Sequence, residues 1–144
     1  MKKIIVLLGL AMSFSCFSEV RTFYYESGAF KGNANYKNGN LDGISTFYDE
    51  SGALLLEESY KNGNLDGISK QYYLSGALLL EESYKNGYLD GITKKYYESG
   101  AIWIEEIYRN GNLEGITKNY SEDGRLMGRK NYKNGKIIGT WNRK

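Results

Sequence analysis

Residues 44–67 read ISTFYDESGALLLEESYKNGNLDG, and this stretch recurs along the chain every 24 residues without an insertion. Residues 92–115, for example, read ITKKYYESGAIWIEEIYRNGNLEG, with conservative changes at the same places. Glycine marks three phases of the repeat, and tyrosine recurs at half its length from Tyr24 to Tyr132. A unit of this length is too short for paired helices and suits a two-stranded hairpin. The pattern therefore predicts a β-hairpin repeat.

Within one unit the residues predict two strands, at about 44–48 and 53–60, separated by a tight turn at 49–52. Gly52 supplies the positive φ that this turn needs. The Asn62-Gly63 pair turns the chain again, and Asp66-Gly67 completes a longer connection. About five such units predict an all-β chain. We expect an elongated single-layer antiparallel meander of about ten strands, in which each unit leans on its neighbours.

The first 18 residues differ from the repeat. Lys2 and Lys3 precede an apolar run at 4–14 and small residues near 18, which is typical of a bacterial secretory signal peptide. We therefore predict a signal peptide at 1–18 and a repeat array at 19–144, which makes the protein periplasmic, cell-surface or secreted. The predicted repeats lie at about 20–43, 44–67, 68–91, 92–115 and 116–139. The alternative is a lipid anchor at Cys16, although Ser13 stands where a lipoprotein signal normally has leucine.

The composition argues against catalysis. The chain has no histidine and one cysteine, which removes the commonest general base, the histidine-activated nucleophiles and most zinc sites. Glu57-Glu58 recurs at 81–82 and 105–106, whereas a catalytic carboxylate pair occurs once, in a cleft. The NGNLDG turns offer too few acidic side chains for calcium. We expect no enzyme, no catalytic residues, no cofactor and no metal, and the few basic residues predict no nucleic-acid partner.

Strand alternation predicts a core face. Ile44, Thr46 and Tyr48 share one face of the first strand, and we match it to the Leu54, Leu56, Glu58 and Tyr60 face of the second. The resulting core ladder contains Ile44, Ile68, Ile92, Ile116, the twelve-spaced tyrosines, Leu54, Leu78, Ile102 and Leu126. On the same face we expect Glu58 opposite Lys70, Glu82 opposite Lys94, and Glu106 opposite Lys118, as cross-strand ion pairs.

The candidate binding residues are Leu55, Leu79, Trp103 and Met127, which share one phase of the repeat opposite the predicted core. Large apolar side chains in a row on a solvated face indicate a binding surface, with Trp103 as its anchor. The alternative is that neighbouring side chains or curvature of the sheet cover this row.

Charge is unevenly distributed along the array. Residues 19–115 hold 9 basic and 15 acidic side chains, whereas 116–144 hold 8 basic and 2 acidic. The basic end is either a solvated cap or a contact surface for an anionic partner or for end-to-end self-association.

Two motifs resemble a known family: Tyr-Lys-Asn-Gly-Asn-Leu-Asp-Gly at 60–67 and a strand ending in Tyr-Tyr-Glu-Ser-Gly-Ala at 96–101. They are similar to the MORN-repeat variant of many bacterial proteins, over about residues 21–142. The resemblance implies a curved β-hairpin array that serves as an interaction module, and some bacterial members are antitoxin-like. We expect a non-catalytic exported scaffold that binds a protein at the cell envelope or a host surface. The alternatives are an antitoxin-like immunity protein and a structural envelope component that assembles end to end.

Overall fold

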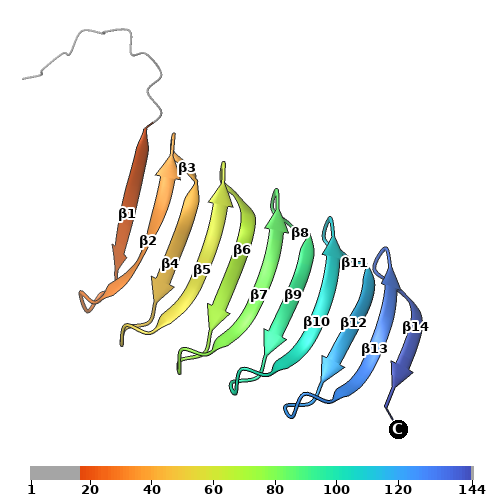
Figure 1. Cartoon of the computed structure of the whole chain (residues 1–144). Coiled ribbons are helices and arrows are strands. Elements are labelled where there is room, and N and C mark those ends of the chain that lie inside the picture. Colours follow the sequence, from red (N-terminus) through yellow and green to blue (C-terminus); the bar gives the residue numbers. More distant parts are fainter. Residues whose placement is uncertain (1–16, 144) are drawn as a thin grey trace, which may run out of the picture.

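The computed structural model describes residues 17–143, and every regular element in that range is a β-strand (Figure 1). The strands are β1 (Ser18–Tyr24), β2 (Phe30–Lys37), β3 (Asn40–Leu41), β4 (Gly43–Tyr48), β5 (Leu54–Lys61), β6 (Asn64–Tyr72), β7 (Leu78–Lys85), β8 (Tyr88–Leu89), β9 (Gly91–Tyr96), β10 (Ile102–Arg109), β11 (Asn112–Leu113), β12 (Gly115–Tyr120), β13 (Leu126–Lys133) and β14 (Lys136–Asn142).

All these strands belong to one antiparallel sheet, whose order along the molecule is β1-β2-β4-β5-β6-β7-β9-β10-β12-β13-β14. The two-residue strands β3, β8 and β11 pair with β2, β7 and β10. Strands that follow one another in the chain therefore lie side by side, and no second layer formed by residues 17–143 covers the sheet (Figure 1). The predicted all-β single-layer meander is confirmed. Of the predicted signal peptide, residues 1–16, including Cys16, lie outside the described residues.

At one end of the strands, along the length of the sheet, the Asn-Gly pairs form two-residue hairpin turns. Asn62 has φ 50° and Gly63 has φ 83°, and the equivalent pairs in the other units have similar values. Positive φ at both positions is the geometry of a type I′ turn, whose twist matches that of the flanking strands. Asparagine and glycine tolerate this conformation better than other residues, so the predicted turn forms where the sequence places it.

Neighbouring units are joined at this end of the strands by a repeated pair of hydrogen bonds between their turns. The Asp66 carboxylate accepts a bond from the backbone N–H of Asn86 at 3.0 Å, and Gly87 N–H donates to the Leu65 carbonyl at 2.8 Å. The same carboxylate bond joins Asp42 to Asn62, Asp90 to Asn110, and Glu114 to Asn134. The acidic residue of each turn therefore holds the turn of the next unit.

At the other end of the strands, tyrosine hydroxyls connect one unit to the next. The Tyr73 hydroxyl donates to the Tyr96 carbonyl at 2.8 Å, and the Tyr97 hydroxyl donates to the Tyr120 carbonyl at 2.9 Å. Tyr25 bonds the Tyr48 carbonyl in the same way. The hairpins that carry this tyrosine are therefore bonded to the next hairpin at both of their ends, in addition to the strand ladders. The β4–β5 hairpin has Asp49 at the equivalent position, and this residue bonds Ser51 and Ala53 of its own turn instead.

A β-bulge interrupts the pairing of each hairpin and sets which side chains share a face. Phe47 pairs with Leu56 and Tyr48 pairs with Leu54, so that Leu55 has no partner on β4. An extra residue shifts all later pairs by one, and a one-residue shift moves a side chain to the other face of the sheet. Beyond the bulge, β4 pairs Gly43 with Tyr60, Ile44 with Ser59, Ser45 with Glu58, and Thr46 with Glu57.

The predicted core ladder is therefore wrong. Tyr60 lies across from Gly43, on the face of Ser45, whereas Ile44 lies on the other face with Ser59. The four isoleucines placed in the core are 37–52% exposed, and they are Ile44, Ile68, Ile92 and Ile116. The tyrosines divide between the two faces instead of forming one ladder. Matching the two strands without the bulge produced this error.

Buried side chains in the described part of the chain are small. Ala34, Ser45, Ser69 and Thr93 lie within one stripe that crosses the middle of the sheet, with at most 3% exposure. Larger side chains are only half-buried because a single layer leaves both faces open. We infer that this sheet depends more on strand pairing and on contacts between neighbouring side chains of the same face than on a central apolar core.

We predict that Asp66→Ala lowers the free energy of unfolding by about 1 kcal/mol, because the Asn86 N–H loses its acceptor. Urea unfolding followed by circular dichroism measures this change. Asp66→Asn is the matched control, since it keeps an acceptor oxygen at the same place and should lose less than half as much. Equal losses in the two variants would contradict the role assigned to the bond.

Candidate functional site

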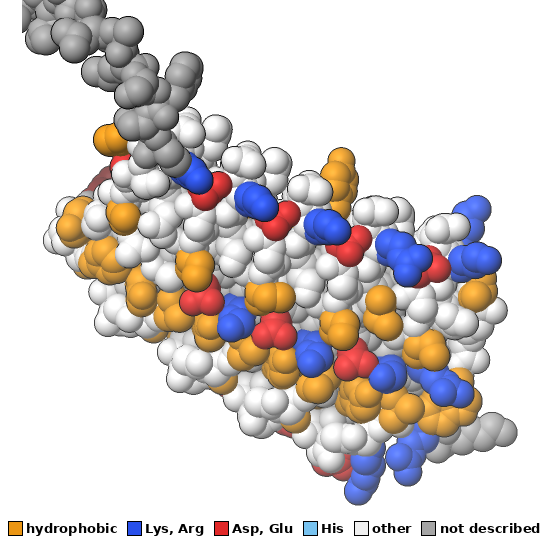
Figure 2. Space-filling model, turned by 45° about the horizontal axis from the view of Figure 1, so that its top comes forward, with side chains coloured by type: hydrophobic (Ala, Val, Ile, Leu, Met, Phe, Trp, Pro, Cys, Tyr) orange, Lys and Arg blue, Asp and Glu red, His pale blue; other side chains and the backbone are white. Residues whose placement is uncertain are grey.

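One face of the sheet carries a row of alternating charges, and we call it the ladder face. The pairing places Glu57 opposite Lys70, Lys70 opposite Glu81, and Glu81 opposite Lys94. The row continues through Glu105 to Lys118. It therefore crosses six neighbouring strands from β5 to β12. Figure 2 shows this face, with alternating acidic and basic side chains across the molecule and hydrophobic side chains on both sides of the row.

The expected ion pairs involving Glu58, Glu82 and Glu106 are wrong by one residue. Glu57 takes the place predicted for Glu58, and Glu105 takes the place predicted for Glu106. Lys118 Nζ lies 2.7 Å from Glu105 Oε1, and this bond raises the pKa of Lys118. The physical cause is the pairing register, which brings the first glutamate of each pair, and not the second, across from lysine.

Apolar side chains flank the charged row on the ladder face. On one side lie the exposed isoleucines of β4, β6, β9 and β12, together with Ile107. On the other side lie tyrosines such as Tyr96, whose pKa is raised by burial and by Glu81 and Glu105. Because no second layer covers the described sheet, both apolar rows remain accessible to a partner.

The opposite face, which we call the carboxylate face, holds the second glutamate of each pair. The Tyr60 hydroxyl donates to Glu58 Oε2 at 2.7 Å, and the same bond joins Tyr84 to Glu82 at 3.0 Å. Tyr108 and Glu106 repeat it at 3.2 Å. Burial, followed by the hydrogen bond to Glu82, raises the pKa of Tyr84 to about 12. Burial and Glu106 raise the pKa of Tyr108 to about 12.

Two buried hydroxyl groups on the carboxylate face lack a hydrogen-bond partner. They belong to Ser45, opposite Glu58, and Thr93, opposite Glu106. An unbonded polar group away from water destabilises the fold, although the small size of serine and threonine lets the larger neighbours lie close together. These positions are therefore better explained by packing than by chemistry.

The four predicted binding residues occupy one structural position, that of the bulge. Leu55, Leu79, Trp103 and Met127 are each the residue skipped by the pairing of their hairpin, and Lys31 is the equivalent residue of the first unit. We call these four residues the bulge row. Leu55 and Leu79 are half-buried, whereas Trp103 is 41% and Met127 44% exposed. The Trp103 ring lies against Tyr97, with 5.8 Å between ring centroids.

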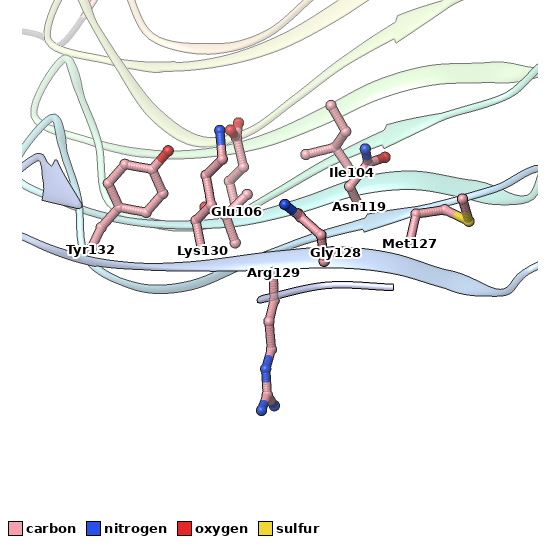
Figure 3. Close-up of a pocket in the computed structure, with 10 residues that line it drawn as sticks. Ile104, Glu106, Asn119, Met127, Gly128, Arg129, Lys130 and Tyr132 are labelled. Carbon is pink, nitrogen blue, oxygen red and sulfur yellow. The ribbon is translucent and has the colours of Figure 1, made fainter. Parts of the chain in front are cut away.

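A shallow hollow of about 260 Å³ adjoins the bulge row at the C-terminal end of the sheet. Figure 3 shows Met127, Asn119, Lys130 and Tyr132 on one side of the ribbon, while Arg129 points to the other. Ile104, Glu106, Thr117 and Asn142 complete the polar and apolar lining.

The hollow arises where the repeat changes. Gly128 stands where inner units have Leu56, Leu80 and Ile104, so a large side chain is missing. A Cβ at Gly128 would lie 2.8 Å from Asn142 Oδ1 and 3.2 Å from the Trp141 carbonyl oxygen, so a larger residue here would displace the Asn142 side chain. Lys130 also replaces the glutamate of the inner units. The hollow was not among the predicted sites, although Gly128 and Lys130, as departures from the repeat, were the signal in the sequence that could have found it.

Within residues 17–143 no three potential metal-ligating side chains come together. The turn carboxylates considered for calcium, such as Asp66, accept a backbone hydrogen bond from the next unit instead. The described part of the chain also contains no helix with the length and apolar character needed to cross a bilayer.

Four segments of the chain match the family described as MORN repeat variant, at residues 41–62, 65–86, 89–110 and 113–134. These segments cover more than half of the chain and follow the hairpin units of the sheet. The chain therefore belongs to the MORN repeat variant family, and MORN repeats are generally protein-interaction or membrane-binding modules. No curated protein matches the chain.

We predict that the stability of the array falls as the pH rises from about 10 through about 12. An unfolded tyrosine ionises near pH 10, whereas Tyr84 and Tyr108 hold their protons to about pH 12. The unfolded chain then binds fewer protons than the folded chain, so stability decreases with pH in this range. Urea unfolding at several alkaline pH values measures the slope.

The variant Glu82→Gln tests the assignment of this effect. Removing the charge beside Tyr84 should lower the pKa of the Tyr84 hydroxyl, while burial of the hydroxyl keeps this pKa above the ordinary value for tyrosine. The absorbance of tyrosinate as a function of pH measures the change. The same absorbance curve in Glu82→Gln and in the unchanged protein would contradict the proposed contact.

Proposed function

We propose that this protein is a non-catalytic scaffold that binds another protein through the bulge row and the adjoining hollow. The observation that carries the proposal is the repeated bulge, which holds one large side chain per inner unit out of strand pairing. Trp103 and Met127 are the most exposed members of the row. Aromatic residues and methionine are enriched at protein interfaces, and Trp103 is the expected anchor.

The geometry of the site favours binding over reaction. The hollow is shallow, and it combines the apolar Ile104 and Met127 with polar groups such as Asn119 and Asn142. An apolar centre with a polar rim is the ordinary composition of a protein-binding surface. The paired glutamates occur in three successive units, in keeping with a structural device and not with a single catalytic pair.

We further propose that the protein works outside the cytoplasm, at the cell envelope or at a host surface. The support is the sequence pattern at 1–18, with its basic start, short apolar run and small residues before Glu19. The mass of the protein recovered from its producing cells tests this proposal. A chain beginning at Glu19 supports soluble export, a lipid-modified Cys16 supports anchoring, and a chain that retains Met1 contradicts both.

We predict that Trp103→Ala weakens binding of the protein partner by at least about tenfold, as expected for a hot-spot aromatic. Affinity capture from envelope and host-surface extracts with the mature chain identifies the partner, and titration calorimetry with that purified partner measures the change. Leu79→Lys should weaken binding as well, because it introduces a charge into the middle of the bulge row.

Tyr88→Ala is the matched control, since Tyr88 is an exposed aromatic residue of a hairpin edge outside the bulge row. It should leave the affinity unchanged. Equal affinity for Trp103→Ala, Leu79→Lys and the unchanged chain, with all variants folded, would remove the bulge row from the proposal.

A further inference from the structure

The charge order on the ladder face has a geometric property that the carboxylate face lacks. The six central positions read Glu57, Lys70, Glu81, Lys94, Glu105 and Lys118, so the row begins with an acid and ends with a base. Reversing the row and laying it on itself places every glutamate over a lysine. On the carboxylate face the equivalent positions are Glu58, Glu82 and Glu106, which are separated by uncharged residues.

The ladder face is also the face on which the isoleucines remain exposed. Ile68 and Ile92 are more than two-fifths exposed, and they lie along the charged row in the middle of the sheet. The tyrosine and leucine row on the other side of the charges is half-buried. A sheet normally buries one apolar face against another layer, and none of the described residues provides that layer here.

We propose that a second copy of this chain supplies the missing layer, by packing its ladder face against the ladder face of the first. The two copies are related by a two-fold axis that runs parallel to the strands and passes between β7 and β9. This arrangement is a closed, self-complementary dimer, the commonest form of homo-oligomer. It does not rest on the proposed function, because the bulge row and its hollow lie outside the contact.

The two-fold places specific residues in contact. Glu81 lies over Lys94 of the second copy, Lys70 over Glu105, and Glu57 over Lys118. In the adjoining apolar row, Ile68 lies over Ile107 of the second copy, since β6 lies over β10. Beyond Lys118, where the alternation of charge ends, Arg129 lies over the uncharged Thr46 of the second copy. Within its own chain, the Arg129 guanidinium carbon lies 5.8 Å from the centroid of the Trp141 ring.

Charge distinguishes this arrangement from the other face-to-face dimer. A two-fold parallel to the length of the array would place Glu81 over Glu81 and Lys94 over Lys94, and like charges in contact oppose association. The axis parallel to the strands makes each contact of the row attractive or neutral. It also places the isoleucines over isoleucine, serine or, for Ile44, Asn131, and it places tyrosine over leucine or isoleucine.

The area of the face suits a dimer. Ten strands about 4.8 Å apart, each contributing about five residues of about 3.4 Å, give a surface on the order of 800 Å² per copy. Stable protein interfaces bury about 800 Å² per partner.

Two single charge reversals test the proposal, because they affect opposite members of one contact. Lys70→Glu places two glutamates together in its own dimer, and Glu105→Lys places two lysines together. Each variant alone should therefore dissociate at least about tenfold more readily than the unchanged chain. A mixture of the two should dimerise again, because glutamate at 70 then meets lysine at 105. Analytical ultracentrifugation of the mature chain measures all three states.

The mixture separates an interface from a folding defect. Lys70 and Glu105 are not neighbours within one chain, so a variant that fails to fold gains nothing from mixing, and circular dichroism of each variant confirms its fold. Glu106→Lys, on the other face of β10, is the matched control and should leave the dimer intact. A monomeric unchanged chain at all concentrations, or a mixture of folded variants that stays monomeric, would overturn the proposal.

Discussion

A single unpaired residue in each hairpin determines which side chains share a face of this sheet. Leu55 and its equivalents are skipped by the strand pairing, and each later residue of the strand is displaced by one position relative to its partner. Because side chains alternate along a strand, that displacement moves every later side chain to the opposite face relative to its partner strand. The pairing of Lys70 with Glu81 and the position of the isoleucines on the face opposite the tyrosine–glutamate pairs both follow from the bulge.

A single-layer sheet needs other sources of cohesion than an apolar core. Here the strand ladders are reinforced along both edges, by carboxylates that accept bonds from the next turn and by tyrosine hydroxyls that bond the next unit. Small side chains occupy the middle stripe, so that larger neighbours can lie against one another. Each unit contacts only its neighbours, and the stability of such an array is close to a sum of unit and junction energies.

The two faces differ in what they offer a partner. The ladder face combines balanced charge with exposed isoleucine, a combination suited to a surface of the same kind. The carboxylate face holds its glutamates in tyrosine hydrogen bonds, and it bears the hollow beside Met127 at the point where the repeat is interrupted. Membership of the MORN repeat variant family agrees with a role in binding, and the two surfaces allow self-association and partner binding to occur together.

The amino-acid sequence alone was sufficient for the architecture. The 24-residue period, the Asn-Gly pairs and the alternating strands predict consecutive hairpins, because turn geometry and strand periodicity depend on neighbouring residues. It also identified Leu55, Leu79, Trp103 and Met127 as a distinct row, without revealing why they are distinct. Only the tertiary structure decided the register, because a bulge forms between two strands and leaves no mark in the pattern of either one. For the same reason the partner of each glutamate, the exposure of Ile44 and the hollow at Gly128 became visible only when the strands lay side by side.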